Sequence, residues 1–257
     1  MAQRSLGAIY PDLEGKSVIV TGGGSGIGAA IVRAFARQKA KVGFIDIAEE
    51  PANALTAELG RDGVVVPFAK ADIRDIDALR TAIAALTSAI GAADVLINNA
   101  GNDERHATPD VTPEMFDDRI AVNLRHSFFA AQAVLPGMQA KGGGVIVNFS
   151  SMSWMAGMGG MPIYTAAKSA MIGLTRSLGR DYGSYNIRVN AIAPGWVRTE
   201  RQVTKWLTPE GDSKRLEAQC LKRWVEPDDI ARFCVFLASD DASACTAQHY
   251  VVDAGWV

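Results

Sequence analysis

The hydrophobic positions of the chain fall into short apolar runs and longer segments with helical spacing, and the two kinds alternate. The helical segments, in which apolar residues recur about every 3.6 positions, cover residues 29–38, 75–90, 112–138, 165–178 and 227–238. The short runs predict strands at residues 16–21, 41–45, 64–69, 94–98, 144–149, 187–192 and 248–252. Strands that alternate with helices in this way predict an α/β fold built on a parallel, doubly wound sheet.

The predicted elements continue through all 257 residues without a linker, a repeat or a low-complexity tract. We therefore expect a single domain, residues 1–257, with a dinucleotide-binding part at about 13–150 and a catalytic, substrate-binding part at about 151–257. Residues 200–225 are long and polar, and contain Trp206, Pro209 and Trp224. A connection of this length inside a compact domain is usually a lid or a mobile loop, so we expect a lid at 198–225.

Charge and composition exclude several classes of protein. Lysine and arginine number 26 against 28 acidic residues, and the net charge of −2 predicts no binding to nucleic acid or to an anionic membrane. No apolar run approaches the roughly 20 residues that span a bilayer, and the first residues lack the apolar core of a signal peptide. Cys220, Cys234 and Cys245 form no CxxC pair, so we expect neither disulfides nor a metal site. Cytoplasm is the expected location.

The first predicted strand ends in a glycine turn that leads directly into a helix. The turn consists of Gly22, Gly23, Gly24, Ser25, Gly26, Ile27 and Gly28. Glycines allow the backbone to approach a pyrophosphate closely, at the positive N-terminus of the helix that follows. The spacing is not the strict GxGxxG, but the position between strand and helix favours a phosphate-binding role.

An acidic residue ends the second predicted strand. Asp46 lies eighteen residues after Gly28, where a carboxylate can accept hydrogen bonds from both adenosine ribose hydroxyls and repel a 2′-phosphate. A helix cap or a solvated loop acid is the alternative interpretation. Ser25 brings no positive charge to the glycine turn, and Ile47 stands where an arginine could have met the phosphate. These residues favour NAD as the cofactor and disfavour NADP.

Two further groups of residues allow more than one interpretation. Asn98, Asn99, Ala100 and Gly101 follow the fourth predicted strand, where they suit either contact with a cofactor ribose or an ordinary turn. Asn123 lies among apolar residues of the 112–138 helix, so its amide needs buried partners. The residues alone leave structural and functional roles for Asn123 equally open.

The chemistry of the chain centres on Tyr164 and Lys168. Their spacing of four residues places both side chains on one face of a helix, where an ammonium can lower the pKa of the phenol. A tyrosine tuned in this way can take a proton from an alcohol or return it to a ketone. Ser151, just after the fifth predicted strand, can hold its hydroxyl near the same reacting oxygen. Taken singly, each of these residues could have a purely structural role, and a tyrosine in a helix is more often packed than catalytic.

Together these motifs resemble those of the short-chain dehydrogenase/reductase family. The matching motifs are Thr21-Gly22-x3-Gly26-Ile27-Gly28, Asn98-Asn99-Ala100-Gly101, Asn123, Ser151, Tyr164-x3-Lys168 and Pro194-Gly195. The resemblance covers nearly the full length and implies a Rossmann-type domain of seven parallel strands. It also implies hydride transfer with NAD(P) and a homotetramer joined partly by the helices that carry Asn123 and Tyr164. One departure is Ala254, where many members have glycine.

The resemblance assigns roles to individual positions. It makes Tyr164 the acid/base, Ser151 the holder of the substrate oxygen, Lys168 the group that lowers the tyrosine pKa and binds the nicotinamide ribose, and Asn123 the anchor of a proton-conducting water. Asp72 and Ile73 would meet adenine, Asn99 the adenosine-side ribose region, and Thr199 the carboxamide. The implied cofactor contacts are Gly22, Gly24, Ser25, Gly26, Ile27, Gly28, Asp46, Asp72, Ile73, Asn99, Ala100, Gly101, Tyr164, Lys168, Pro194, Gly195, Val197 and Thr199.

Within the family, several stretches look like bacterial aldose 1-dehydrogenases. These stretches are Asn102-Asp103-x-Arg105-His106, Asp118-Arg119-Ile120-Ala121-x-Asn123, Ser127-Phe128-Phe129-Ala130, Asn148-Phe149-Ser150-Ser151-x-Ser153-Trp154, and Pro194-Gly195-Trp196-Val197-x-Thr199-Glu200-Arg201-Gln202. The likeness implies NAD-dependent oxidation of a pentose or 6-deoxyhexose, such as L-arabinose, D-xylose or L-fucose, at C1 to the aldonolactone. Asp103 could also supply hydrogen bonds, and the expected substrate contacts are Asn102, Arg105, Ser151, Ser153, Trp154, Tyr164, Trp196 and Gln202. Arg105 and His106 could instead brace the pocket walls.

Three other functions are compatible with parts of this pattern. An α/β-hydrolase would need a Gly-x-Ser-x-Gly elbow, and neither Ser25 nor Ser151 lies in one. A non-catalytic dinucleotide-binding regulator would not need the tyrosine and lysine, and both are present. A dehydrogenase of another secondary alcohol, such as a polyol, a hydroxysteroid or a 3-oxoacyl thioester, is the alternative enzyme.

Overall fold

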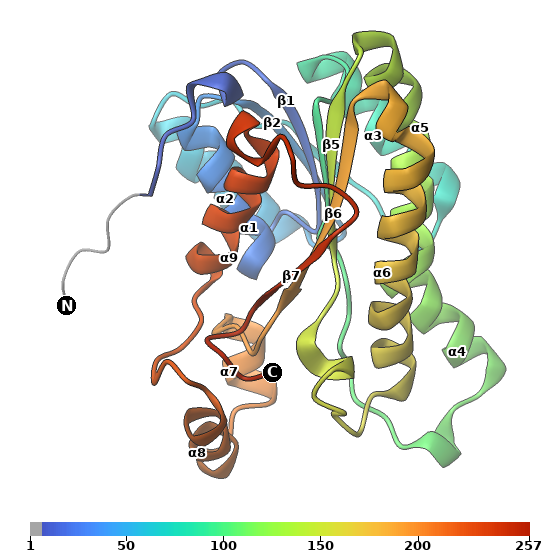
Figure 1. Cartoon of the computed structure of the whole chain (residues 1–257), viewed down its shortest axis with the longest axis vertical. Helices are drawn as coiled ribbons and strands as arrows, with labels where there is room; N and C mark the ends of the chain where they lie inside the picture. The colour runs from blue at the N-terminus through green and yellow to red at the C-terminus, as the bar shows by residue number, and fades with distance from the viewer. Residues whose placement is uncertain (1–6) are drawn as a thin grey trace.

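A single parallel sheet forms the centre of the molecule (Figure 1). The computed structural model describes residues 7–257. Its strands are β1 (Ser17–Thr21), β2 (Lys41–Asp46), β3 (Phe68–Lys70), β4 (Val95–Asn98), β5 (Gly144–Phe149), β6 (Ile187–Pro194) and β7 (His249–Val252). They lie in the order β3-β2-β1-β4-β5-β6-β7, and every pair is parallel. The predicted Rossmann-type, doubly wound sheet of seven strands in a single domain is confirmed.

Helices cover both faces of this sheet, as its continuous apolar strands require. On one face lie α1 (Gly26–Arg37), α2 (Glu49–Arg61) and α9 (Pro227–Ala238), whose apolar residues share a core with β1, β2 and β5. On the other face lie α3 (Ile76–Ile90), α5 (His126–Lys141) and α6 (Pro162–Tyr182). Figure 1 shows the two layers on opposite sides of the strands. The order reverses between β1 and β4, and this switch point opens a crevice at the carboxyl ends of the strands.

The long helix predicted at 112–138 has an irregular middle. It consists of α4 (Pro113–Ile120), a π-helical turn (Ala121–Arg125) and α5. Asn123 is fully buried in the turn, and its amide donates to the Arg119 carbonyl at 3.0 Å. A side chain that bonds the backbone inside its own helix competes with the regular ladder, which accounts for the wider turn.

Several predicted boundaries were wrong. The third strand begins at Phe68 rather than at residue 64, because Pro67 cannot donate in a ladder and Val65 is 88% exposed. The helix α2 was not predicted at all. The segment expected as a lid, residues 198–225, contains two helices that were not predicted, α7 (Glu200–Lys205) and α8 (Pro209–Ala218). The side chains of Thr199 and Thr208 cap these two helices. Among the described residues, no helix is long and apolar enough to cross a membrane.

Candidate active site

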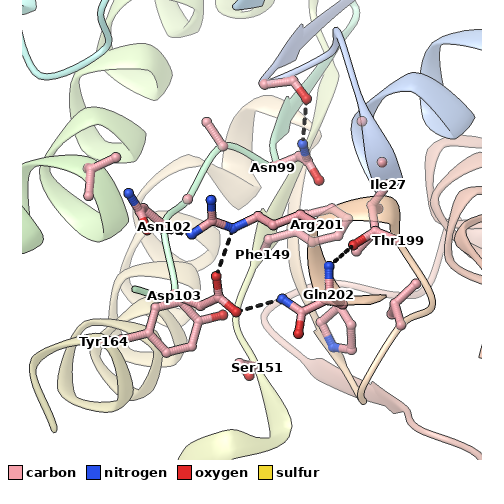
Figure 2. A pocket seen from close by; sticks show the side chains of 18 of the residues that line it. Ile27, Asn99, Asn102, Asp103, Phe149, Ser151, Tyr164, Thr199, Arg201 and Gln202 are labelled. Atoms are coloured by element: carbon pink, nitrogen blue, oxygen red, sulfur yellow. Dashed lines mark hydrogen bonds and ion pairs between the residues drawn. The ribbon is translucent and has the colours of Figure 1, made fainter. Parts of the chain in front are cut away.

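A cavity of about 840 Å³ opens at the carboxyl ends of the strands, where the switch point predicts it. It is bounded by the turn between β1 and α1, by the ends of β2, β4, β5 and β6, and by α7 (Figure 2). Most of the predicted site residues line it, namely Gly22, Ser25, Gly26, Ile27, Gly28, Asp46, Asp72, Ile73, Asn99, Ala100, Gly101, Asn102, Arg105, Ser151, Ser153, Tyr164, Lys168, Pro194, Gly195, Trp196, Val197, Thr199 and Gln202. Three do not line it: Gly24, Asn123 and Trp154.

The glycine turn forms a cradle that larger residues would fill. A Cβ atom on Gly28 would lie 1.8 Å from the carbonyl oxygen of Gly22, which no real contact allows. Gly22 itself has a φ of +67°, and the Asn99 amide donates to its carbonyl at 2.9 Å. The positive end of α1 therefore borders a surface of bare backbone, and these residues fit a pyrophosphate.

Asp46 lies at the end of β2, and its carboxylate borders the cavity. It accepts hydrogen bonds from the backbone N–H of Gly24 at 2.8 Å and of Ala48 at 3.0 Å. Gly24 thus contributes by fixing Asp46 rather than by lining the cavity. The Ile47 side chain beside it is 55% exposed and carries no charge. This corner fits a ribose diol better than a phosphate.

The neighbouring cation is already neutralised. Arg74 lines the cavity but bonds Asp72, and it also bonds Asp118 at 2.7 Å. The hydrogen bond from the Arg74 side chain holds the pKa of the Asp72 carboxyl below its usual value. The charge of Arg74 is therefore already paired with two carboxylates.

Lys168 is held in one position by the end of β5. Its side chain is buried, and its Nζ donates to the carbonyl of Phe149 at 2.9 Å. The hydroxyl of Ser150 donates to the Lys168 carbonyl at 2.6 Å, which ties α6 to the same strand. One helical turn earlier, the ring of Tyr164 lies with its centroid 5.7 Å from Nζ.

Ser151 completes the cluster. Its hydroxyl lies near enough to the Tyr164 side chain to lower the pKa of that phenol, and it accepts from the backbone N–H of Ser153 at 3.2 Å. The fold thus brings Ser151, at the end of β5, to the two side chains that α6 places one turn apart, Tyr164 and Lys168.

The pKa values of this cluster bear on one expectation. Burial raises the pKa of Tyr164 to about 12, although the nearby Ser151 hydroxyl acts to lower it. Burial also lowers the pKa of Lys168 to about 8. In the protein alone the pKa of Tyr164 therefore lies above its ordinary value, because desolvation of the phenolate dominates, and the expected lowering by Lys168 stays a prediction. A bound cation, such as an oxidised nicotinamide, would act in the opposite direction.

Asn123 lies behind the cavity wall instead of in it. Its amide accepts from the Asn102 backbone N–H at 2.8 Å and donates to the Asn102 carbonyl at 3.0 Å. A Cβ atom on Gly101 would lie 3.1 Å from Asn123 Oδ1 and 3.2 Å from Lys168 Nζ. Asn123 therefore fixes the loop after β4 close to the ammonium.

The helix α7 reaches across the cavity to that same loop. Arg201 bonds Asn102 at 3.1 Å, Asp103 at 3.1 Å and Glu104 at 3.0 Å, and Lys205 also bonds Glu104 at 2.9 Å. These partners lie about a hundred positions apart in the chain, so the sequence carried no signal for this contact. The predicted site residues did not include Arg201, Glu104 or Lys205.

The aromatic residues divide between wall and interior. Trp196 lines the cavity, and its ring meets Trp224 edge to face at 5.7 Å. Trp154 faces elsewhere: its Nε1 donates to Ser150 at 3.2 Å, and its ring lies 6.5 Å from that of His249. The expectation that Trp154 packs on a substrate is wrong for this reason. Arg105 lines the cavity with its guanidinium 4.9 Å from the ring of Trp206.

Known proteins with similar sequences and structures place these observations in context. Residues 22–257 match the family model described as Enoyl-(Acyl carrier protein) reductase. The chain is 49% identical to a D-xylose 1-dehydrogenase of Caulobacter vibrioides, over 97% of this chain and 98% of that one. It is also 49% identical to the Probable galactose dehydrogenase GalD of Rhizobium meliloti, over 96% of each. A 7α-hydroxysteroid dehydrogenase solved with NADH and 7-oxo glycochenodeoxycholic acid superposes with a TM-score of 0.91 at 34% identity, covering 96% of both chains.

We expect Gly28→Ala to damage the cradle. The added methyl group forces the backbone to move, which should lower the free energy of unfolding by about 1–3 kcal/mol and weaken NADH binding strongly. Chemical denaturation and titration of NADH fluorescence measure the two effects. Gly60→Ala is the matched control, because Gly60 lies in α2 with no atom within 4 Å of its added Cβ. Similar behaviour of the two variants would contradict this account of the turn.

Proposed function

The chain belongs to the short-chain dehydrogenase/reductase family, and we propose that it oxidises an aldose at C1 to the aldonolactone with NAD. The observation that carries the proposal is the cluster of Ser151, Tyr164 and Lys168 beside a cavity with a glycine cradle. The substrates that we propose are pentoses and 6-deoxyhexoses. The names of the two relatives at 49% identity support a sugar as substrate.

The cofactor would lie between the glycine turn and the end of β5. Gly22, Gly26 and Gly28 would hold its pyrophosphate, and Asp46 would accept hydrogen bonds from its adenosine ribose. When bound, NAD would accept the hydride that leaves C1 of the sugar. NADP is disfavoured because its 2′-phosphate would meet the Asp46 carboxylate, while the neighbouring Arg74 is already paired with Asp72.

The protein's own residues would manage the proton. In the proposal, the Tyr164 phenolate takes the proton of the C1 hydroxyl while the Ser151 hydroxyl holds that oxygen, so that C1 becomes a carbonyl carbon as its hydride departs. Lys168, with a pKa of about 8, is suited to pass the proton onward and to bind the nicotinamide ribose. Asn123 positions the loop beside the lysine, where a water could connect it to solvent.

The substrate would lie at the rim between α7 and the loop after β4. Asn102, Arg105, Ser153 and Trp196 line this part of the cavity and could contact a polyhydroxylated ring. Residues 198–225, with α7 at their start, would serve as the lid.

We also propose that the enzyme is cytoplasmic and a homotetramer. Phe116 of α4 and Phe128 of α5 are 46% and 44% exposed, and apolar side chains exposed in this way support an interface between subunits.

We expect NAD to be preferred over NADP, and Asp46→Ala combined with Ile47→Arg to reverse the preference. The double substitution removes a repelling carboxylate and adds a cation, so the ratio of kcat/KM for NAD to that for NADP should fall at least roughly tenfold. Steady-state kinetics with both cofactors measure the ratio. Glu50→Ala, which removes an exposed acid outside the cavity, should leave it unchanged. An unmutated enzyme as efficient with NADP as with NAD would contradict the cofactor proposal.

We expect the product from a pentose or 6-deoxyhexose to be the aldonolactone, which then hydrolyses to the acid. Proton NMR of the reaction mixture should show loss of the anomeric signal in step with NADH formation. Oxidation at another carbon would retain C1 as a hemiacetal, so the spectrum separates the two outcomes. Activity on a polyol or hydroxysteroid without activity on any aldose would overturn the proposal.

A further inference from the structure

Asp103 occupies a place in the cavity that neither the catalytic cluster nor the cofactor cradle explains. It lies in the loop after β4, two residues past Gly101, and its side chain is 21% exposed. Burial dominates the pKa shifts of Tyr164 and Lys168, but the Asp103 carboxylate also acts on both pKa values and raises each. Asp103 is therefore close enough to Tyr164 and Lys168 for its charge to act on both side chains. Figure 2 shows its carboxylate directed into the space between Tyr164 and Gln202.

Two residues of α7 hold this carboxylate in a fixed orientation. The Arg201 Nε donates to Oδ1 at 3.1 Å, and the Gln202 Nε2 donates to Oδ2 at 2.6 Å. A carboxylate has about four acceptor positions, so each oxygen keeps capacity for another donor. The loop beneath is also fixed, because Asn123 bonds both the N–H and the carbonyl of Asn102.

Gln202, which the sequence predicted as a substrate contact, already has partners at both ends of its amide. Its Nε2 bonds Asp103, and its Oε1 accepts from the Trp196 Nε1 at 2.8 Å. Each end of the amide keeps capacity for one further bond, but its orientation is already set by Asp103 and Trp196. Its geometry suits a residue that orients Asp103 between the cavity wall and α7.

We propose that Asp103 is the specificity-determining residue that accepts a hydrogen bond from the C2 hydroxyl of the sugar, with Arg201 and Gln202 as its positioning residues. This inference rests on the proposed oxidation of an aldose at C1. Ser151 would hold the oxygen on C1 and Tyr164 would take its proton, and Asp103, which lines the same cavity, would then face the adjoining carbon. A carboxylate accepts strongly from a hydroxyl, since bonds to charged groups are stronger than neutral ones.

The same arrangement distinguishes substrates by what is missing. An analogue without the C2 hydroxyl would leave a partly buried carboxylate facing the sugar with unused acceptor capacity. A site built to pair a hydroxyl rejects such analogues far more strongly than an apolar pocket does. The enzyme should therefore discriminate against 2-deoxy sugars through this one side chain.

The test compares kcat/KM for the best aldose and for its 2-deoxy counterpart, at saturating NAD, in the unmutated enzyme and two variants. Asp103→Asn keeps the shape of the side chain and removes its charge. Glu104→Gln is the matched control, because Glu104 bonds the same helix through Arg201 and Lys205 but does not line the cavity. NADH affinity is measured for each variant to confirm a folded cofactor site.

We expect the parent-to-2-deoxy ratio of kcat/KM to fall roughly ten- to hundredfold in Asp103→Asn and to stay unchanged in Glu104→Gln. A ratio that persists in Asp103→Asn, or that falls equally in both variants, would overturn the inference while leaving the proposed function intact. If Asp103→Asn does not bind NADH, Asp103→Glu replaces it: the displaced carboxylate should still lower the ratio, and an unchanged ratio overturns the inference. An unmutated enzyme that oxidises no aldose would overturn both proposals.

Discussion

The hydrogen bond from Lys168 Nζ to the Phe149 carbonyl is the contact on which the site depends. An ammonium that is only 3% exposed is costly unless it has a partner, so this bond fixes where α6 meets the end of β5. The bond between Ser150 and the Lys168 carbonyl reinforces the same junction. The position of Tyr164 follows from this junction, because one turn of α6 separates it from Lys168 and places its phenol beside Ser151 in the cavity wall. The fixed position of the Lys168 ammonium also favours glycine at position 101, since a Cβ atom there would lie 3.2 Å from Nζ.

The opposite side of the cavity is held by weaker contacts. The helix α7 meets the loop after β4 partly through exposed side chains, such as Arg201 at 41% and Lys205 at 45%. Ion pairs of this kind contribute about 0–1 kcal/mol each. The side formed by β5 and α6 is thus held by buried hydrogen bonds, and the α7 side mainly by exposed ion pairs. Asp103 lies between the two sides, where Arg201 and Gln202 of α7 hold its carboxylate.

The sequence was sufficient for the parts of the structure that depend on local pattern. The glycine turn, the strand ends that carry Asp46 and Ser151, and the one-turn spacing of Tyr164 and Lys168 all follow from periodicity and residue type. What the sequence could not provide were directions set by distant partners. From the sequence alone, Trp154 and Trp196 are equally plausible as residues that pack on a sugar. In the structure, the indole of Trp154 hydrogen-bonds Ser150 outside the cavity lining, and Trp196 forms part of the cavity wall. The shift of the Tyr164 pKa likewise depends on burial, which no spacing of residues reveals.

The most direct test of the account is the variant Tyr164→Phe, measured for NADH binding and for the rate of sugar oxidation in the same preparation. The substitution removes one oxygen, so NADH should bind with nearly unchanged affinity. The oxidation rate should fall by a factor on the order of 10² to 10⁴, because only the proton transfer is lost. In the unmutated enzyme the rate should rise with pH, since the phenol, with its raised pKa, must lose its proton before it can act as the base. A Tyr164→Phe enzyme that retained most of its activity over the pH values at which the rate of the unmutated enzyme rises would contradict the assignment of Tyr164 as the base.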